Sequence, residues 1–266
     1  MSLAAGFVCA DGIVLVRTTE HSGSTPQWTP TAIFQRSAAA YEVALTGTGD
    51  ASLVRMAADH LLERELDDDD GLDEVWKKSE RVANRLAKKY IFCHGERDTE
   101  KPRLQLLVAV RAREGSRLLL RSEANRLAKS DGCEFVGVGQ ELARSVASWL
   151  YEPPLTVSVV SQLAAHIIHW TAEHAPACGR ALQVLSLTGT AQPAPPQQIP
   201  LEGECFWGLH RLLQPILTGV LDERLSDVQF DDRLRWFEER MVAVRQACGD
   251  ERRRESDSGG VAQKQS

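Results

Sequence analysis

The chain has 266 residues, of which 43% are hydrophobic and 26% charged, and its formal net charge is −6. This composition is that of an ordinary globular protein, and the length suits one large domain with an appendage. The acidic balance gives no general attraction to nucleic acid or anionic lipid, and no stretch approaches the roughly 18 apolar residues of a membrane span. We therefore expect a cytoplasmic protein with neither a nucleic-acid nor a membrane partner.

The six cysteines are scattered along the chain, with no Cys-x-x-Cys pair among them. In a cytoplasmic protein this distribution is typical of reduced thiols, and it favours neither a disulfide framework nor a zinc site. We accordingly predict no metal and no cofactor.

In the first quarter of the chain, apolar runs alternate with turn residues. Ala-Asp-Gly at 10–12 is a strong hairpin turn, and TGTGD at 46–50 ends a strand and places Asp50 to cap a following helix. The segment 21–30 is a loop by composition. A first strand pair is predicted over residues 4–9 and 13–17, and a second over 31–36 and 41–47. An amphipathic helix is predicted over residues 51–66.

The acidic run from Asp67 to Asp70 lies in a predicted turn before a second amphipathic helix. Carboxylates at that place complement the helix dipole, so we expect a solvated turn and not a cation site. The basic stretch from Lys77 to Lys89 alternates with apolar residues, which indicates the solvated side of this second helix.

In the second half of the chain, a strand pair is predicted over residues 104–112 and 116–122. Two helices follow over 141–151 and 157–174, and a last strand over 181–187. Pro-rich sequence then predicts an extended connector, and the chain's end has almost nothing to bury. We divide the chain into a folded domain (1–190), a Pro-rich linker (191–202), a helical extension (203–248) and a disordered tail (249–266). Strand pairs separated by helix pairs favour a layered α+β architecture over a doubly wound fold.

Two blocks of this sequence resemble proteasome β-type subunits and their bacterial proteasome-like relatives. The first block is GFVCADGIVL with AIF and ALTGTGDASLVR; the second is FVGVGQELARSVASWLYEPPLTVSVVSQLAAHIIHWTAEH. The resemblance covers roughly residues 2–188. The resemblance implies the N-terminal-nucleophile (Ntn) hydrolase fold, a four-layer αββα sandwich with two stacked antiparallel sheets between helical layers.

In that family the nucleophile is the first residue of the mature chain, and its own α-amine acts as the general base. A hydroxyl is a weak nucleophile, whereas an α-amine with a pKa of about 8 can accept its proton. Counted back from the shared Gly-x-x-x-x-Asp-Gly segment that begins at Gly6, the resemblance places this nucleophile at Ser2. Met1 is commonly removed before a residue as small as serine, so a free N-terminal residue is chemically available. It also implies that Gly47 supplies an oxyanion-holding N–H, with Cys178 as a weak donor.

The other positions of the family's constellation carry different residues here. The resemblance implies a carboxylate where this chain has Thr18 and a lysine where it has Ala32, and the late polar positions fall at Val138, Ala175 and Cys178. In the family the two charges pair beside the nucleophile, and the lysine lowers the proton affinity of the amine. Their joint loss is physically coherent, since losing one alone would leave a buried charge unpaired.

Two functions stay open on this basis. The first is a proteasome-like subunit that is catalytically degenerate and acts through oligomeric assembly with itself or with related subunits. The alternative is an active N-terminal Ser amidohydrolase or peptidase that uses Ser2 after removal of Met1.

Two further patterns are better explained by structure than by ligand binding. His166, His169, Glu173 and His174 lie at helical spacings, but their helix is apolar and no further ligand is defined, so we interpret them as core or interface residues. Gly137-Val138-Gly139 precedes a helix as a phosphate cradle would, yet it lacks a third glycine and a Gly-Lys-Ser/Thr sequence.

Overall fold

The computed structural model describes residues 2–19, 33–94, 104–123, 126–175 and 182–189, together with Cys178, residues 197–199 and a few single residues between 226 and 242. By its internal contacts the chain divides into two compact units, Met1–Leu201 and Glu202–Ser266. The predicted loop at 21–30, the disordered tail and, apart from those single residues, the helical extension lie outside the described residues.

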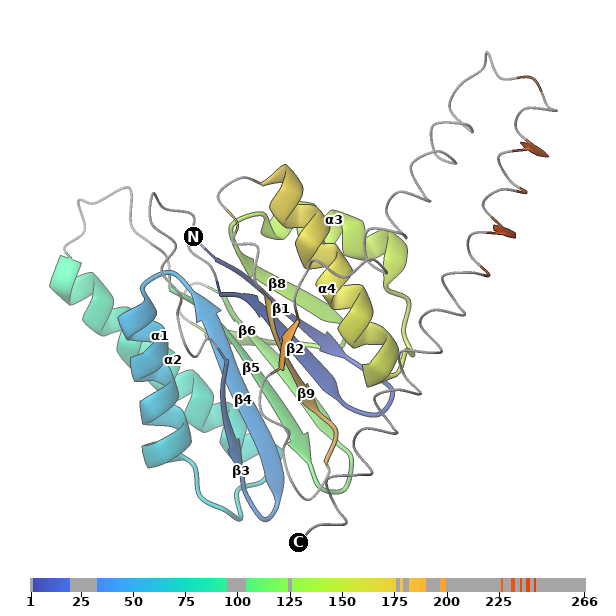
Figure 1. Ribbon diagram of the computed structural model, residues 1–266. Helices are drawn as coiled ribbons and strands as arrows, with labels where there is room; N and C mark the ends of the chain where they lie inside the picture. Colours follow the sequence, from blue (N-terminus) through green and yellow to red (C-terminus); the bar gives the residue numbers. More distant parts are fainter. Residues whose placement is uncertain are drawn as a thin grey trace, which may run out of the picture. The chain divides into compact units, whose positions relative to one another are not determined.

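Two antiparallel sheets of five strands each form the centre of the first unit (Figure 1). The strands of the first sheet are β1 (Leu3–Val8), β2 (Ile13–Thr18), β8 (Cys133–Gly137), β9 (Leu182–Leu187) and β10 (Gln197–Ile199). Those of the second are β3 (Ile33–Ser37), β4 (Tyr41–Thr48), β5 (Gln105–Ala112), β6 (Arg117–Glu123) and β7 (Arg126–Ser130). Their spatial orders are β10-β9-β2-β1-β8 and β3-β4-β5-β6-β7.

Each sheet has its own pair of helices. The helices are α1 (Ala51–Ala58), the π-helix η1 (Asp59–Glu65), α2 (Leu72–His94), α3 (Gln140–Leu150) and α4 (Val157–His174). α1 and α2 pack on the second sheet, whereas α3 and α4 pack on the first (Figure 1). Among the described residues, no helix combines the length and the apolar character needed to cross a bilayer.

The predicted helix over 51–66 is divided in the structure. Asp50 caps α1 as expected, because its side chain accepts hydrogen bonds from the backbone N–H groups of Ser52 and Leu53. After Ala58, however, the helix widens to the π form. Arg36 of β3 donates to the carbonyls of Leu62 (2.6 Å) and Leu66 (2.7 Å) at the end of η1, a long-range contact that helical spacing does not encode.

Three strands are missing from the sequence-based prediction, namely β7, β8 and β10. β8 completes the first sheet beside β1, with Leu3 opposite Gly137. β10 falls inside the predicted linker, where Gln197 pairs with Val184 of β9. All three are short, so their hydrophobic alternation is too brief to indicate a strand without knowledge of the partner.

The apolar layer between the two sheets places the start of β1 beside the second sheet. Ala4, Ile13 and Leu15 of the first sheet pack there against residues such as Leu107 and Leu119 of the second. A Cβ added at Gly6 of β1 would lie 2.7 Å from a Leu119 methyl carbon. The sheets therefore approach closely along β1, and side chains of β1 with even numbers face the other sheet.

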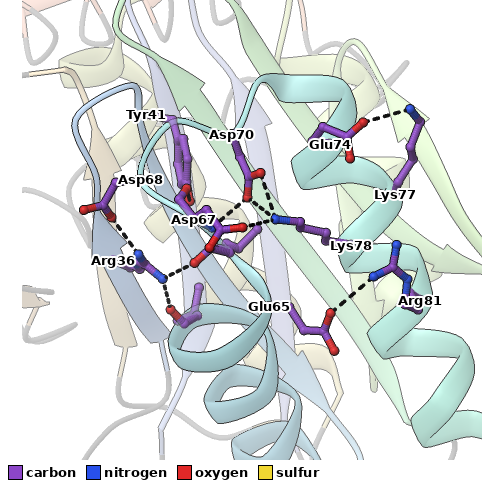
Figure 2. Close-up of polar contacts among 12 residues, drawn as sticks. Arg36, Tyr41, Glu65, Asp67, Asp68, Asp70, Glu74, Lys77, Lys78 and Arg81 are labelled. Atoms are coloured by element: carbon purple, nitrogen blue, oxygen red, sulfur yellow. Dashed lines mark hydrogen bonds and ion pairs between the residues drawn. The ribbon is translucent and has the colours of Figure 1, made fainter.

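The acidic turn from Asp67 to Asp70 is held by two cations (Figure 2). The ammonium of Lys78 on α2 lies 2.7 Å from carboxylate oxygens of both Asp67 and Asp70. Arg36 reaches Asp68 at 2.6 Å from the opposite side. The turn thus connects β3, η1 and α2 through ion pairs. The helix dipole alone predicted a solvated turn without these contacts.

Candidate functional site

Ser2 lies at the point where strand ends of both sheets meet. It directly precedes β1, is 6% exposed, and its carbonyl oxygen accepts a hydrogen bond from the Val138 N–H (3.2 Å). Gly137 has φ +102°, and a Cβ there would lie 2.2 Å from the Ser2 oxygen and 2.7 Å from a Thr48 methyl carbon. The end of β8 therefore presses against Ser2 with a backbone that only glycine accommodates.

Thr18 occupies the position where the resemblance implies a carboxylate. It ends β2 and is fully buried. Its Oγ1 accepts a hydrogen bond from the Leu3 N–H (3.0 Å) and donates to the Leu3 carbonyl (3.4 Å). The hydroxyl therefore bonds to the backbone that follows Ser2 as well as to the Cys178 thiol, and it brings no charge to this place.

Cys178 and Ala175 border the same region. The Cys178 N–H donates to the Ala175 carbonyl (2.8 Å), and the thiol is 3% exposed. Burial raises the pKa of this thiol to about 11, although a hydrogen bond with Thr18 acts in the opposite direction. Ala175 in turn lies against Gly139, where an added Cβ would be 3.3 Å from the alanine methyl. At neutral pH these two positions contribute a neutral thiol and a methyl group.

Gly47 lies in β4 opposite Leu106 of β5. Since the Leu106 N–H donates to the Ser122 hydroxyl on β6 (2.7 Å), Gly47 and Leu106 form a non-bonded pair of the β4–β5 ladder. The Gly47 N–H is consequently directed away from β5, to the side of β4 on which β3 lies. The predicted site position Ala32 lies outside the described residues.

The structure also brings three polar side chains to this end that sequence reasoning missed. Gln105 of the second sheet accepts from the Gly137 N–H of the first (2.8 Å), and Gln183 of the first accepts from the Ile33 N–H of the second (3.0 Å). Arg17, 3% exposed, lies between Ala4 and Gln183 in the ladder, and burial lowers its pKa to about 10. An arginine that ends the continuous apolar run IVLV was the signal available in the sequence.

The histidines of α4 have separate contacts. His169 lies 3.6 Å from Glu173, and the His174 ring nitrogen lies 2.8 Å from the Trp170 carbonyl oxygen, with the two rings stacked. Within the described ranges, no group of three or more His, Cys, Asp or Glu residues has an arrangement that would hold a metal ion. Beside Gly137 and Gly139, the side chains of Thr48 and Thr171 occupy the space that a Cβ would enter, and the N–H groups of Gly137 and Val138 donate to Gln105 and Ser2.

Comparison with known proteins identifies the fold. No protein-family model and no curated protein sequence matches this chain. Among solved structures, Anbu (ancestral beta-subunit) from Yersinia bercovieri aligns with a TM-score of 0.65 at 9% identity, covering 84% of this chain and 98% of that one. The helical assembly of the Anbu complex from Pseudomonas aeruginosa aligns at 0.64 and 14% identity, covering 85% and 98%. A Gly-1 mutant of Anbu from Hyphomicrobium sp. strain MC1 aligns at 0.69 and 9% identity, covering 85% and 99%.

These similarities show a proteasome-like fold, so the resemblance stated from the sequence is confirmed at that level. The structure brings Ser2, Thr18, Val138 and Cys178 together, although they are as much as 176 residues apart (178 − 2) in the chain.

Proposed function

We propose that this chain is a subunit of a proteasome-like assembly, built from copies of itself or related subunits, and that its own Ntn site is catalytically degenerate. The Pseudomonas aeruginosa structure, described as a helical assembly, supports the first part. We infer the αββα layer order from the packing of α1 and α2 on one sheet, α3 and α4 on the other, and an apolar layer between the sheets. The segment 203–248 is then an appended helical extension.

The proposal that the site is catalytically degenerate rests on the burial and hydrogen bonds of Thr18. An Ntn hydrolase needs its α-amine neutral, but an amine with an ordinary pKa of about 7.7–8.0 is mostly protonated at neutral pH. In the family, a lysine held by a carboxylate lowers the proton affinity of this amine. In this chain the carboxylate position is a buried hydroxyl already bonded to Leu3, so it cannot hold a lysine in place.

The competing function, hydrolysis by Ser2, is supported by the retained position of Ser2 and by the direction of the Gly47 N–H. Intact-mass spectrometry of the purified chain separates the two at the first step. If Met1 is retained, Ser2 has no free amine and hydrolysis by Ser2 is eliminated.

If Met1 is absent, we expect a proteasome-type covalent inhibitor to leave Ser2 unlabelled. Labelling that disappears in Ser2→Ala and persists in Ser148→Ala, an exposed serine of α3, would contradict degeneracy. Light scattering on the same sample tests the assembly, since a strict monomer well above micromolar concentration would contradict self-association.

A further inference from the structure

Arg17 places a buried positive charge between the two sheets. Ile13 and Leu15 of the same strand pack in the apolar layer between the sheets, and side chains alternate along a strand, so Arg17 faces that layer too. It is paired in the ladder with Ala4, two residues from Ser2. Burial lowers the pKa of Arg17 to about 10, so its guanidinium stays charged at neutral pH. A cation is therefore present at the Ser2 end of this layer.

Further polar side chains from both sheets face the same end of the layer. Ala4, Leu185, Ala44 and Leu107 pack between the sheets, so the alternation along β1, β9, β4 and β5 turns residues two or four positions away to the same side. At the strand ends nearest Ser2 these residues are polar, and most of them are buried. We call them, together with Arg17, the Arg17 cluster, which comprises Ser2, Arg17, Thr46, Thr48, Gln105 and Gln183.

The Arg17 cluster is rich in hydrogen-bond donors. Arginine carries five N–H donors and no acceptor. The side-chain oxygens of Gln183 and Gln105 accept hydrogen bonds from the backbone N–H groups of Ile33 (3.0 Å) and Gly137 (2.8 Å), so the other half of each amide is an NH₂ donor. Apart from Arg17, the members of the cluster are neutral. Its summed charge and its donors therefore suit an anion.

Thr19 gives an independent indication that this place receives a ligand. It directly follows β2 and is 2% exposed, and its hydroxyl has no hydrogen-bond partner within the described part of the chain. Two residues after Arg17, it falls on the same side by the alternation, whereas the Thr18 hydroxyl between them bonds to Leu3. A buried hydroxyl in this state costs free energy, which a ligand that hydrogen-bonds to it would recover.

The shape of the donors selects among anions. A guanidinium presents parallel N–H groups that match the two oxygens of a carboxylate, and hydroxyl and amide groups can donate to the remaining lone pairs. Ser2 lies beside this arrangement, but its own chemistry is degenerate in the proposed function. We propose that the Arg17 cluster is a binding site for a carboxylate, either the carboxy terminus of a peptide or a free carboxylic acid, which the chain holds without cleaving.

The test uses the full-length chain and three small probes in ligand-observed NMR titrations. The probes are N-acetyl-alanyl-alanine, its carboxy-terminal amide, and acetate, each at the same ionic strength in chloride. The free acid should bind, and the amide, which lacks the negative charge, should not. Acid binding tighter than acetate binding identifies a peptide carboxy terminus as the ligand, whereas equal affinities identify a free carboxylic acid.

Two matched variants test the role of Arg17, since each removes one arginine and changes the net charge equally. Arg17→Met should raise the dissociation constant of the bound carboxylate about 10-fold or more, because hydrogen bonds to a charged group are the strong ones. Arg144→Met, on the partly exposed side of α3, should leave it unchanged. Urea unfolding checks that each variant folds. Thr19→Val removes only a hydroxyl and should raise the dissociation constant about 3-fold or more, so it replaces Arg17→Met if that variant does not fold.

Three results would overturn the carboxylate site. They are a wild-type chain that binds neither the free acid nor acetate, equal binding of acid and amide, and unchanged binding in Arg17→Met or, where that variant is unfolded, in Thr19→Val. Carboxylate binding is measured separately from inhibitor labelling of Ser2 and from light scattering. Its failure would therefore leave the proposed assembly and the degeneracy of Ser2 standing.

Discussion

Replacing Thr18 with valine tests whether its hydroxyl serves the backbone, as the structure indicates. Valine has nearly the same shape, so the substitution removes the hydrogen bonds with Leu3 and Cys178 and leaves no cavity. The chain offers a matched control at the next residue. Thr19 is also buried, at 2% exposed, but its hydroxyl has no hydrogen-bond partner within the described part of the chain.

The two substitutions should change the free energy of unfolding differently. Thr18→Val leaves the Leu3 N–H buried without a partner, which costs about 1–3 kcal/mol. About 2 kcal/mol corresponds to a fall in Tm of roughly 4–8 °C for a folded unit of this size. Thr19→Val exchanges an unpartnered hydroxyl for a methyl group, so it should be neutral or stabilise by up to about 1 kcal/mol.

Urea unfolding followed by far-ultraviolet circular dichroism measures both variants in one buffer, with unchanged m-values as the check on two-state behaviour. The reasoning about the site is refuted if Thr18→Val is as stable as wild type, or if the two substitutions cost the same. Either result would mean that the Thr18 hydroxyl is available for a role other than fixing the start of β1.

Two other predictions concern Gly137 and the buried thiols. Gly137→Ala should lower the free energy of unfolding by about 3 kcal/mol or more, because it adds a backbone clash to a positive φ. Gly115→Ala is the control: its φ is +100° but the space around it is open, so it should cost only about 1 kcal/mol. Equal urea midpoints for the two variants would contradict this prediction. Burial raises the pKa of Cys9 to about 12 and those of Cys133 and Cys178 to about 11, from 9.0. The folded chain therefore keeps thiol protons that the unfolded chain releases, so stability should be greatest below pH 9 and should fall as the pH rises towards 11. The raised pKa values of Tyr41 and Tyr151 act in the same direction and, together with the thiols, outweigh the lowered pKa of Arg17, which acts against it. Urea midpoints that stay constant or rise over that range would exclude this prediction.

Elements encoded by local sequence could be predicted, and the structure agrees with them closely. The Ala-Asp-Gly turn closes the β1–β2 hairpin, where the Cys9 N–H donates to the Gly12 carbonyl. The predicted helix over 157–174 coincides with α4. In both cases the turn chemistry or the apolar spacing lies within the element itself.

The parts that escaped prediction depend on partners far along the chain. The hydrogen bond from Ile33 to Gln183 joins residues 150 apart, and the one from Gly137 to Gln105 joins residues 32 apart. No pattern in either segment marks these glutamines as links between the sheets. The positions of Ser2, Thr18, Val138 and Cys178 were predicted through the family resemblance, and their convergence could not have been derived from spacing alone.

The place of β1 in its sheet also bears on when the amino terminus is accessible during synthesis. β1 lies between β2 and β8, and Ser2 is fixed by Val138, which directly follows β8. A ribosome adding about 5–20 residues per second needs roughly 7–27 s to proceed from Ser2 to Gly137. For that interval the nascent strand lacks its second neighbour, which gives an aminopeptidase at the exit tunnel time to act on Met1. Where Met1 is removed, the order of strand pairing therefore favours its removal during synthesis, before the sheet closes.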